Sequence, residues 1–363
     1  MMMEDRSSDA LDRLSHALGK HKLARVAMME RITARFLTTQ WHKDLEKTLD
    51  DTLCTLLQRT DPSKPRGAGN RREGAVILVL GETGAGKTRA VRRLLSNHPA
   101  YAGFDKAGDD DKNPSAIHVE VTAPGNFLSI GMQILEASGY PVIRDLKGRE
   151  IRSLLTDRLK MLGTTVLYLD EMHSVTDTAK VNEIEDLLAA IKGLVANPVW
   201  PIVVIISGLP RLTDFIEKSR EVTRRTRPVA CEELSQDDGE DREMLTALIL
   251  ELADMAQLKI TGAQITTLIP RLIHAASNQL GYAITLIHRA IGSALDAEVG
   301  RLSIQHFAEG YADCTQCGPG ANPFLVPDWC AVTPLQLLRK DTLPAPRLIQ
   351  PKAKRTKAKG ARG

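Results

Sequence analysis

The stretch LGETGAGKT, residues 80–88, combines two glycines with a cation and a hydroxyl at fixed spacing. Gly81 is followed after four residues by Gly86, Lys87 and Thr88, which completes the phosphate-loop pattern. Glycines let successive backbone N–H groups turn inward around phosphate oxygens, and a helix that starts there adds partial positive charge. Lys87 can reach the β- and γ-phosphates, and Thr88 can offer its hydroxyl to Mg²⁺. We therefore expect ATP and Mg²⁺ as ligands, bound by Gly81, Glu82, Thr83, Gly84, Ala85, Gly86, Lys87 and Thr88.

A second stretch, TVLYLDEMH at residues 165–173, ends an apolar run with two carboxylates. At the carboxyl end of a strand, both side chains can face a phosphate loop. We expect Asp170 to hold Mg²⁺ together with Thr88, mainly through the water shell of the ion. Glu171 would orient or deprotonate the attacking water. We expect His173 to be a hydrogen-bonded polar residue under the site without a catalytic role.

ATP hydrolysis needs more charge stabilisation than one lysine and one metal ion usually supply. Ser207 ends the apolar run IVVIIS and could contact the γ-phosphate or the water. The stretch EVTRRTRPV offers Arg224, Arg225 and Arg227 just before a possible fifth strand. One of these arginines could reach the ATP of a neighbouring subunit, as trans-acting arginines do in other NTPases. Solvation or pairing with acids is the alternative for each of them.

Apolar runs alternating with helix-like segments must position these residues. The runs with strand character are 75–80, 116–121, 165–170 and 202–207. The helix-like segments are 88–97, 126–138, 149–162 and 181–196. Continuous apolar runs are typical of strands buried on both faces, and their alternation with helices predicts a parallel sheet covered on both sides.

The pattern along the chain predicts four parts. Residues 1–70 form an N-terminal helical segment with a linker rich in Pro, Gly and charge, and 71–232 form the P-loop ATPase core. Residues 233–312 have helical periodicity, with a capping box expected at Thr261 and Gln264, and form a lid. Residues 313–363 form an irregular extension with a basic tail.

Charge is distributed unevenly over the chain. The net charge is +3, yet the last twelve residues, KAKRTKAKGARG, hold six lysines or arginines and no acid. The body is therefore slightly acidic, and the tail suits either a polyanion or mere solubility. Cations that could contact DNA also occur in the segment 144–160, although acids among them leave a solvated helix as the alternative. These cations are Arg144, Lys147, Arg149, Arg152, Arg158 and Lys160.

The composition also limits the cellular setting. No stretch approaches the roughly 18–20 apolar residues of a membrane span, and the N-terminus lacks a secretory pattern. The five scattered cysteines fit reduced thiols better than a disulfide framework. Cys314 and Cys317 have no second close pair, which argues against a structural zinc site. We expect a cytoplasmic protein without a membrane partner.

Taken together, these motifs resemble those of an AAA+ ATPase. More narrowly, residues 25–330 resemble the TniB-type bacterial transposition ATPases, which are relatives of TnsC and MuB. The resemblance rests on the phosphate loop, LDEMH at 169–173, PIVVIISGLPRL at 201–212, RTRPV at 225–229 and NPF at 322–324. It implies an α/β fold, namely an AAA+ P-loop NTPase with a parallel five-stranded sheet, a C-terminal all-α lid and an N-terminal helical segment.

The resemblance also implies a function. Such a protein is an ATPase that regulates DNA transposition, assembles on DNA in an ATP-dependent way, and recruits or activates a transposase at the target. The implied partners are further copies of this chain, double-stranded DNA bound without sequence preference, a DDE-type transposase and a targeting protein. Two alternatives stay open: an ATP switch or scaffold that acts without DNA, and a helicase-loader or secretion-type AAA+ ATPase.

Residue roles follow from the resemblance by position. Arg225 matches the trans-acting arginine of the family, so the expected catalytic residues are Glu171, Arg225 and Ser207. The family has Arg-Phe where this chain has Arg225 and a threonine, which leaves Arg224 open.

Two departures from the AAA+ pattern affect the expected rate. Ser207 stands where Asn is commoner, and GYAI at 281–284 places Ile284 where many lids carry the arginine of Gly-x-x-Arg. We therefore expect hydrolysis to be slow and regulatory.

Overall fold

The structure is a computed structural model of the chain, and it describes residues 6–104, 115–123, 125–140, 147–173, 175 and 180–339. The chain divides into two compact units. The α/β unit comprises Thr33–Ser235 and Asn278–Ile284, and the helical unit comprises Met1–Ile32, Gln236–Ser277 and Thr285–Gly363. The basic tail at 352–363 and Arg144 lie outside the described residues.

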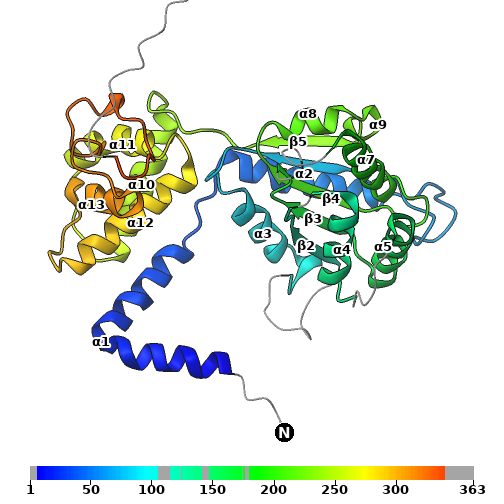
Figure 1. The fold of residues 1–363 in the computed structure, drawn as a ribbon, viewed down its shortest axis with the longest axis horizontal. Helices are drawn as coiled ribbons and strands as arrows, with labels where there is room; N and C mark the ends of the chain where they lie inside the picture. Colours follow the sequence, from blue (N-terminus) through cyan, green and yellow to red (C-terminus); the bar gives the residue numbers. More distant parts are fainter. Residues whose placement is uncertain are drawn as a thin grey trace, which may run out of the picture. The chain divides into compact units, whose positions relative to one another are not determined.

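Five parallel strands form the sheet of the α/β unit, in the order β2-β3-β4-β1-β5 (Figure 1). They are β1 (Val76–Leu80), β2 (Ala116–Glu120), β3 (Val166–Asp170), β4 (Val203–Gly208) and β5 (Thr226–Ala230). Every residue of β1, β3 and β4 is buried, as expected for strands covered on both faces. The predicted five-stranded parallel sheet is confirmed, and it places the carboxyl ends of all strands at one edge.

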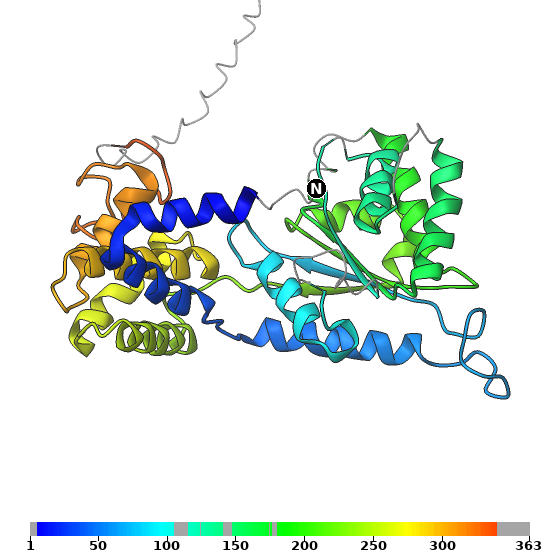
Figure 2. The same cartoon turned by 90° about the horizontal axis from the view of Figure 1, so that it is seen from below.

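Helices cover both faces of this sheet (Figures 1 and 2). α2 (Gln40–Leu56) and α3 (Lys87–Asn97) pack on one face, in a core with the odd-numbered residues Ile77 and Val79 of β1. The other face is covered by α4 (Phe127–Ala137), α5 (Gly148–Leu162), α7 (Val181–Val195), α8 (Leu212–Glu217) and α9 (Arg220–Thr223). The period of two in each strand thus divides the apolar residues between two cores.

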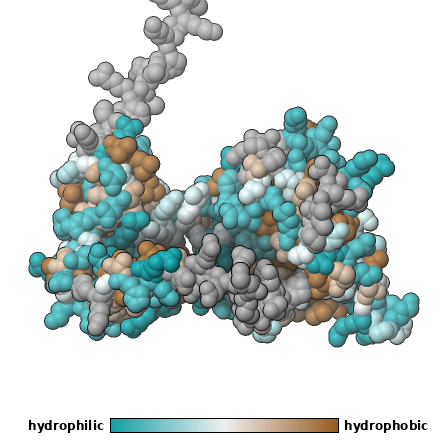
Figure 3. Space-filling model, turned by 60° about the horizontal axis from the view of Figure 1, so that its bottom comes forward, coloured by the Kyte–Doolittle hydropathy of each residue, from teal (hydrophilic) through white to brown (hydrophobic). Residues whose placement is uncertain are grey.

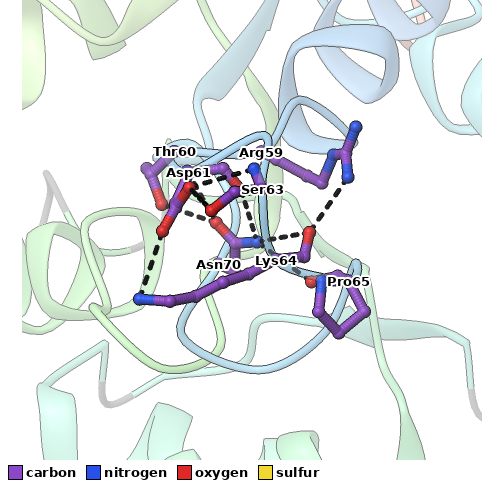
Figure 4. A network of polar contacts seen from close by, with 7 residues as sticks. All are labelled: Arg59, Thr60, Asp61, Ser63, Lys64, Pro65 and Asn70. Carbon is purple, nitrogen blue, oxygen red and sulfur yellow. Dashed lines mark hydrogen bonds and ion pairs between the residues drawn. The ribbon is translucent and has the colours of Figure 1, made fainter.

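The N-terminal boundary differs from the expected one. α2 buries Trp41, Leu45 and Leu49 in the core of the sheet, so the compact α/β unit extends back to Thr33 rather than beginning at residue 71. The segment after α2, which the sequence predicts as a linker, is a loop held together by the side-chain amide of Asn70 (Figure 4). Its amide nitrogen donates to the carbonyls of three loop residues, Asp61, Lys64 and Pro65. Its oxygen accepts from the Thr60 hydroxyl and the Asp61 N–H.

The helical unit contains α10 (Gly239–Met255), α11 (Gly262–Ala275), most of α12 (Leu280–Asp296), α13 (Ile304–Thr315) and most of α1 (Arg6–Ala34), which is interrupted at Gly19. The capping box at the start of α11 is present: the Thr261 N–H donates to Gln264 Oε1 over 3.1 Å. After α13 the described chain is irregular apart from η3 (Trp329–Ala331). None of the described helices combines the length and apolar character of a membrane span.

On the face shown in Figure 3, hydrophobic residues form small patches separated by hydrophilic ones, so this face has no large apolar surface that would indicate a function. Among the described residues there is no group of three or more side chains arranged to hold a metal by His, Cys, Asp and Glu alone. The polar residues that follow β1, β3 and β4 are therefore the better starting point for a functional site.

Candidate nucleotide-binding site

The glycine-rich loop connects β1 to α3 at the carboxyl edge of the sheet. Gly84 and Gly86 have φ angles of 85° and 89°, in the left-handed region that glycine enters without steric cost. Gly86 is the N-cap of α3, so the first N–H groups of that helix face the loop. A Cβ at Gly81 would lie 2.8 Å from the Cβ of Cys231. The loop backbone therefore needs the glycines that the motif predicts.

Lys87 lies inside this loop and is only 6% exposed. Its ammonium donates to the carbonyl oxygens of Gly81 and Glu82, at 2.8 and 2.9 Å. A buried ammonium needs such partners. Phosphate oxygens are stronger acceptors because they carry negative charge, and they can replace these carbonyls. The arrangement thus holds a cation where an anionic ligand would enter.

A polar cluster lies at the ends of β3 and β4, next to the loop. Asp170 is 1% exposed, and the Ser207 hydroxyl donates to its Oδ1. The Thr88 side chain lies near enough to Asp170 to help lower the pKa of that carboxyl. The structure therefore brings together the two residues expected to hold Mg²⁺ and places Ser207 on the same carboxylate. Hard oxygen donors of this kind are the ligands that Mg²⁺ prefers, so the residues fit the ion.

Asp170 is held as a carboxylate despite its burial. Burial alone would raise its pKa, but interactions with neighbouring polar side chains outweigh burial and lower the pKa to about 2. These side chains are His118, Ser207, Thr88 and Tyr168, of which Ser207 donates a hydrogen bond to the carboxylate. At neutral pH the site therefore presents a negative charge to a cation.

This low pKa predicts a contribution to acid stability. Because the folded-state pKa of Asp170 is about 2 and its ordinary value is 3.8, the stabilisation is complete above pH 4 and is lost as pH falls to 2. Between pH 4 and pH 2, wild-type protein should therefore lose about 2 kcal/mol more unfolding free energy than Asp170→Asn protein, because asparagine does not titrate. Urea unfolding of both proteins at several pH values measures this difference. Parallel pH profiles would contradict the assignment.

Glu171 follows Asp170 in an unusual backbone conformation. Its φ is 58°, which is uncommon for a residue other than glycine and is concentrated at functional positions. Its side chain is 40% exposed, and its Oε2 lies 2.9 Å from His173 Nδ1. In this structure the carboxylate therefore rests against His173. For Glu171 to orient water, it must turn from this histidine toward the loop.

Two residues of the site were not predicted from the sequence motifs. His118 on β2 lies 3.8 Å from Asp170 Oδ2 through its Nε2, and its ring stacks on Tyr168 with 4.7 Å between centroids. The Tyr168 hydroxyl lies 3.1 Å from Ser207 Oγ. In the sequence, the only indication of this pair is that each of two apolar runs contains a polar ring. In the structure, His118 and Tyr168 are paired in register across β2 and β3. Both residues help to hold Asp170 in place.

The structure does not bring Arg225 to the phosphate loop of its own unit. It precedes β5 at the amino edge of the sheet, where the Val76 N–H donates to its carbonyl. Its Nε and one terminal nitrogen donate to the two oxygens of Glu73 at 2.8 and 2.9 Å, and its other terminal nitrogen donates to the carbonyl of Glu221. The side chain is only 8% exposed. Arg224 next to it is exposed, and Arg227 is half-buried.

Some of the proposed DNA-contacting cations are already engaged inside the α/β unit. Arg158 donates to the carbonyl of Ser138, and the Arg152 guanidinium lies 5.0 Å from the centre of the Phe127 ring. Lys147 is the N-cap residue of α5, and its side chain makes no capping hydrogen bond. Lys147, Arg149, Arg152 and Lys160 are exposed, but the acids among them, Glu150 and Asp157, leave a solvated helix as the simpler interpretation.

Comparisons with known proteins agree with this geometry. Residues 70–216 match the family model described as an AAA domain. None of the curated proteins matches this chain. Among solved structures, Cdc6p from Pyrobaculum aerophilum is similar with a TM-score of 0.52 and 14% identity, covering 77% of this chain and 69% of that one.

Two structures from Aeropyrum pernix are also similar. ORC1 in complex with DNA has a TM-score of 0.50 and 17% identity, covering 75% of this chain and 64% of that one. ORC2 in its ADPNP–ADP complexes has a TM-score of 0.51 and 14% identity, covering 75% and 66%. This chain thus spans 64% to 69% of the length of the three proteins. At such identities the similarity establishes the fold, which is that of an AAA+ P-loop NTPase.

Proposed function

We propose that this protein binds ATP with Mg²⁺ at residues 81–88 and hydrolyses it slowly. The observation that carries the proposal is the buried carboxylate of Asp170, with Ser207 bonded to it and Thr88 near it, beside a loop whose lysine is held by backbone carbonyls. A nucleoside triphosphate needs a cation, a metal site and oriented hydroxyls, and these groups occur together beside the loop.

Each residue then has a distinct task. Lys87 exchanges its carbonyl partners for phosphate oxygens, and the N–H groups at the start of α3 point at the same anion. Thr88 and Asp170 would hold Mg²⁺, which when bound neutralises developing charge on the phosphates. Ser207 fixes the orientation of Asp170. Glu171 takes up the proton of the attacking water after leaving His173.

We infer that the second cation comes from another copy of the chain. Arg224, Arg225 and Arg227 lie at the amino edge of the sheet, opposite the edge at which β1 leads into the loop. None of the three can therefore serve the loop of its own unit. Arg225, the residue expected from the sequence, has all three guanidinium nitrogens engaged with Glu73 and Glu221. We assign the trans-acting role to exposed Arg224, with Arg225 fixing the backbone beside it.

The biological setting that we propose is DNA transposition. The support is the resemblance of LDEMH, the β4 segment and RTRPV to TniB-type ATPases, together with a fold shared with a protein solved in complex with DNA. On this proposal, ATP drives assembly of cytoplasmic copies on double-stranded DNA without sequence preference. The assembly recruits or activates a DDE-type transposase, with a targeting protein as a further partner. An ATP switch or scaffold that acts without DNA, or a helicase-loader or secretion-type AAA+ ATPase, remains the alternative.

Lys87→Ala tests the nucleotide site itself. The substitution removes the only cation inside the loop, so we expect ATP affinity to fall by about 10²-fold or more, as for loss of several charge-assisted hydrogen bonds. Equilibrium titration with a fluorescent ATP analogue measures this change. Lys64→Ala, on an exposed loop lysine, is the matched control and should bind as wild type does. Wild-type affinity in Lys87→Ala protein would place the nucleotide elsewhere.

A further inference from the structure

The phosphate loop is in contact with a segment almost 200 residues later in the chain. The ring of Tyr282 occupies the space where a Cβ of Gly84 would be, contacting it through the ring atoms Cδ2, Cε2 and Cζ. A Cβ at Gly281 would collide with the carbonyl oxygen of Gly84. These two residues begin α12 and belong to the α/β unit together with the loop. Gly281 therefore contacts the loop through its backbone, and Tyr282 contacts the loop backbone through its ring.

Specific hydrogen bonds bring this segment to the loop. After α11, the left-handed residues Ser277 and Asn278 (φ 50° and 61°) reverse the chain. The Leu234 N–H donates to the carbonyl of Asn278 over 2.7 Å, and the buried Gln279 amide donates to Glu233 Oε1 over 3.2 Å. The start of α12 is thereby fastened to the segment that follows β5.

That segment also supports the loop directly. The Cys231 N–H donates to the carbonyl of Leu80 over 2.7 Å, and Gly81 packs on the Cys231 side chain. The loop is thus held at Gly81 by residues after β5, and at Gly84 and Gly86 by the start of α12.

We propose that Gly281 and Tyr282 are positioning residues for the phosphate loop, and that this chain uses shape at the start of α12 where many AAA+ lids use an arginine. The proposal rests on the nucleotide site proposed above. Neither residue supplies charge to ATP. They pack against Gly84, and thereby fix the direction of the backbone N–H groups around it.

Gly281 gives an unusually selective test, because it lies in a helix where alanine is the better residue. Its glycine is required by the close approach of Gly84 rather than by its own backbone. In Gly281→Ala protein the new methyl group must push the loop away by roughly 1 Å to reach ordinary contact. Misaligned N–H groups then bind phosphate poorly, while the helix itself is not weakened.

The experiment measures two quantities on the full chain: affinity for a fluorescent ATP analogue and the nucleotide-free melting temperature. For Gly281→Ala we expect affinity to fall about tenfold or more, as for loss of one charge-assisted hydrogen bond, with a melting temperature equal to wild type or above it. Gly262→Ala, at the first residue of α11 with open space around it, should change neither. Wild-type affinity in Gly281→Ala protein would overturn the proposal.

Tyr282 provides a second, independent variant. The Tyr282 atoms nearest to Gly84 all belong to the ring, so Tyr282→Phe should keep wild-type affinity and Tyr282→Ala should lose about tenfold. Equal affinity in Tyr282→Ala and wild type would also overturn the proposal. If wild-type protein itself binds no ATP analogue, the proposed function fails first. A different outcome separates the two proposals. If wild-type and Gly281→Ala protein bind the ATP analogue equally well and Lys87→Ala protein does not bind it, only the positioning role fails.

Discussion

Arg224→Ala protein should bind ATP as wild type does and hydrolyse it about 10³-fold more slowly, or slower still, in the range of trans-acting arginines of other NTPases. The reason is geometric. The loop, Asp170 and Glu171 lie at the carboxyl edge of the sheet, and Arg224 lies beyond its amino edge with its side chain exposed. On the proposal above, a neighbouring copy meets Arg224 there. Phosphate release under saturating ATP measures the rate, and analogue titration shows that binding survives.

Arg225→Ala is the comparison that separates a trans-acting cation from a local support. Because Arg225 holds Glu73 through two hydrogen bonds and lowers the pKa of that carboxyl, its loss should reduce stability, and more so above pH 4.5 than below it. Mixing Arg224→Ala with Lys87→Ala protein should restore part of the activity, since some junctions pair an intact loop with an intact arginine. If only Arg225→Ala protein complements Lys87→Ala, the trans role returns to Arg225.

Glu171→Gln should leave ATP bound but reduce its hydrolysis by about 10²-fold or more, which is the usual contribution of a general base. The amide keeps the size of the side chain and removes the proton acceptor. If the ATP-bound form drives assembly, this variant should also form long-lived oligomers, which light scattering would detect. Glu185→Gln, an exposed glutamate on α7, is the matched control and should behave as wild type. Unchanged hydrolysis in Glu171→Gln protein would remove Glu171 from its role.

Much of the α/β unit could be predicted because it depends on local pattern. Continuous apolar runs specify strands buried on both faces, and a Gly-Lys-Thr sequence after such a strand specifies both a turn and its charge. The observed β1 at Val76–Leu80 and α3 at Lys87–Asn97 lie within one residue of the expected ranges. The parallel sheet then brings the ends of β3 and β4 to the loop without further information.

The contacts that escaped prediction join residues far apart in the chain. Nothing near Arg225 in sequence indicates that Glu73, 152 residues away, would hold it. The stacking of His118 on Tyr168 depends on strand register, which apolar runs do not specify. The packing of α2 on the sheet was hidden because an amphipathic helix has the same pattern whether it packs on a sheet or on another helix.

Phosphate release by wild-type protein, with and without random-sequence duplex DNA, tests both ATP hydrolysis and its link to DNA. Glu171→Gln protein measured in parallel reports contaminating activity. We expect slow release of phosphate that rises when DNA is added, with Glu171→Gln near background in both conditions. A wild-type rate indistinguishable from that of Glu171→Gln would contradict ATP hydrolysis at this site, and a genuine rate that DNA leaves unchanged would contradict the proposed assembly on DNA.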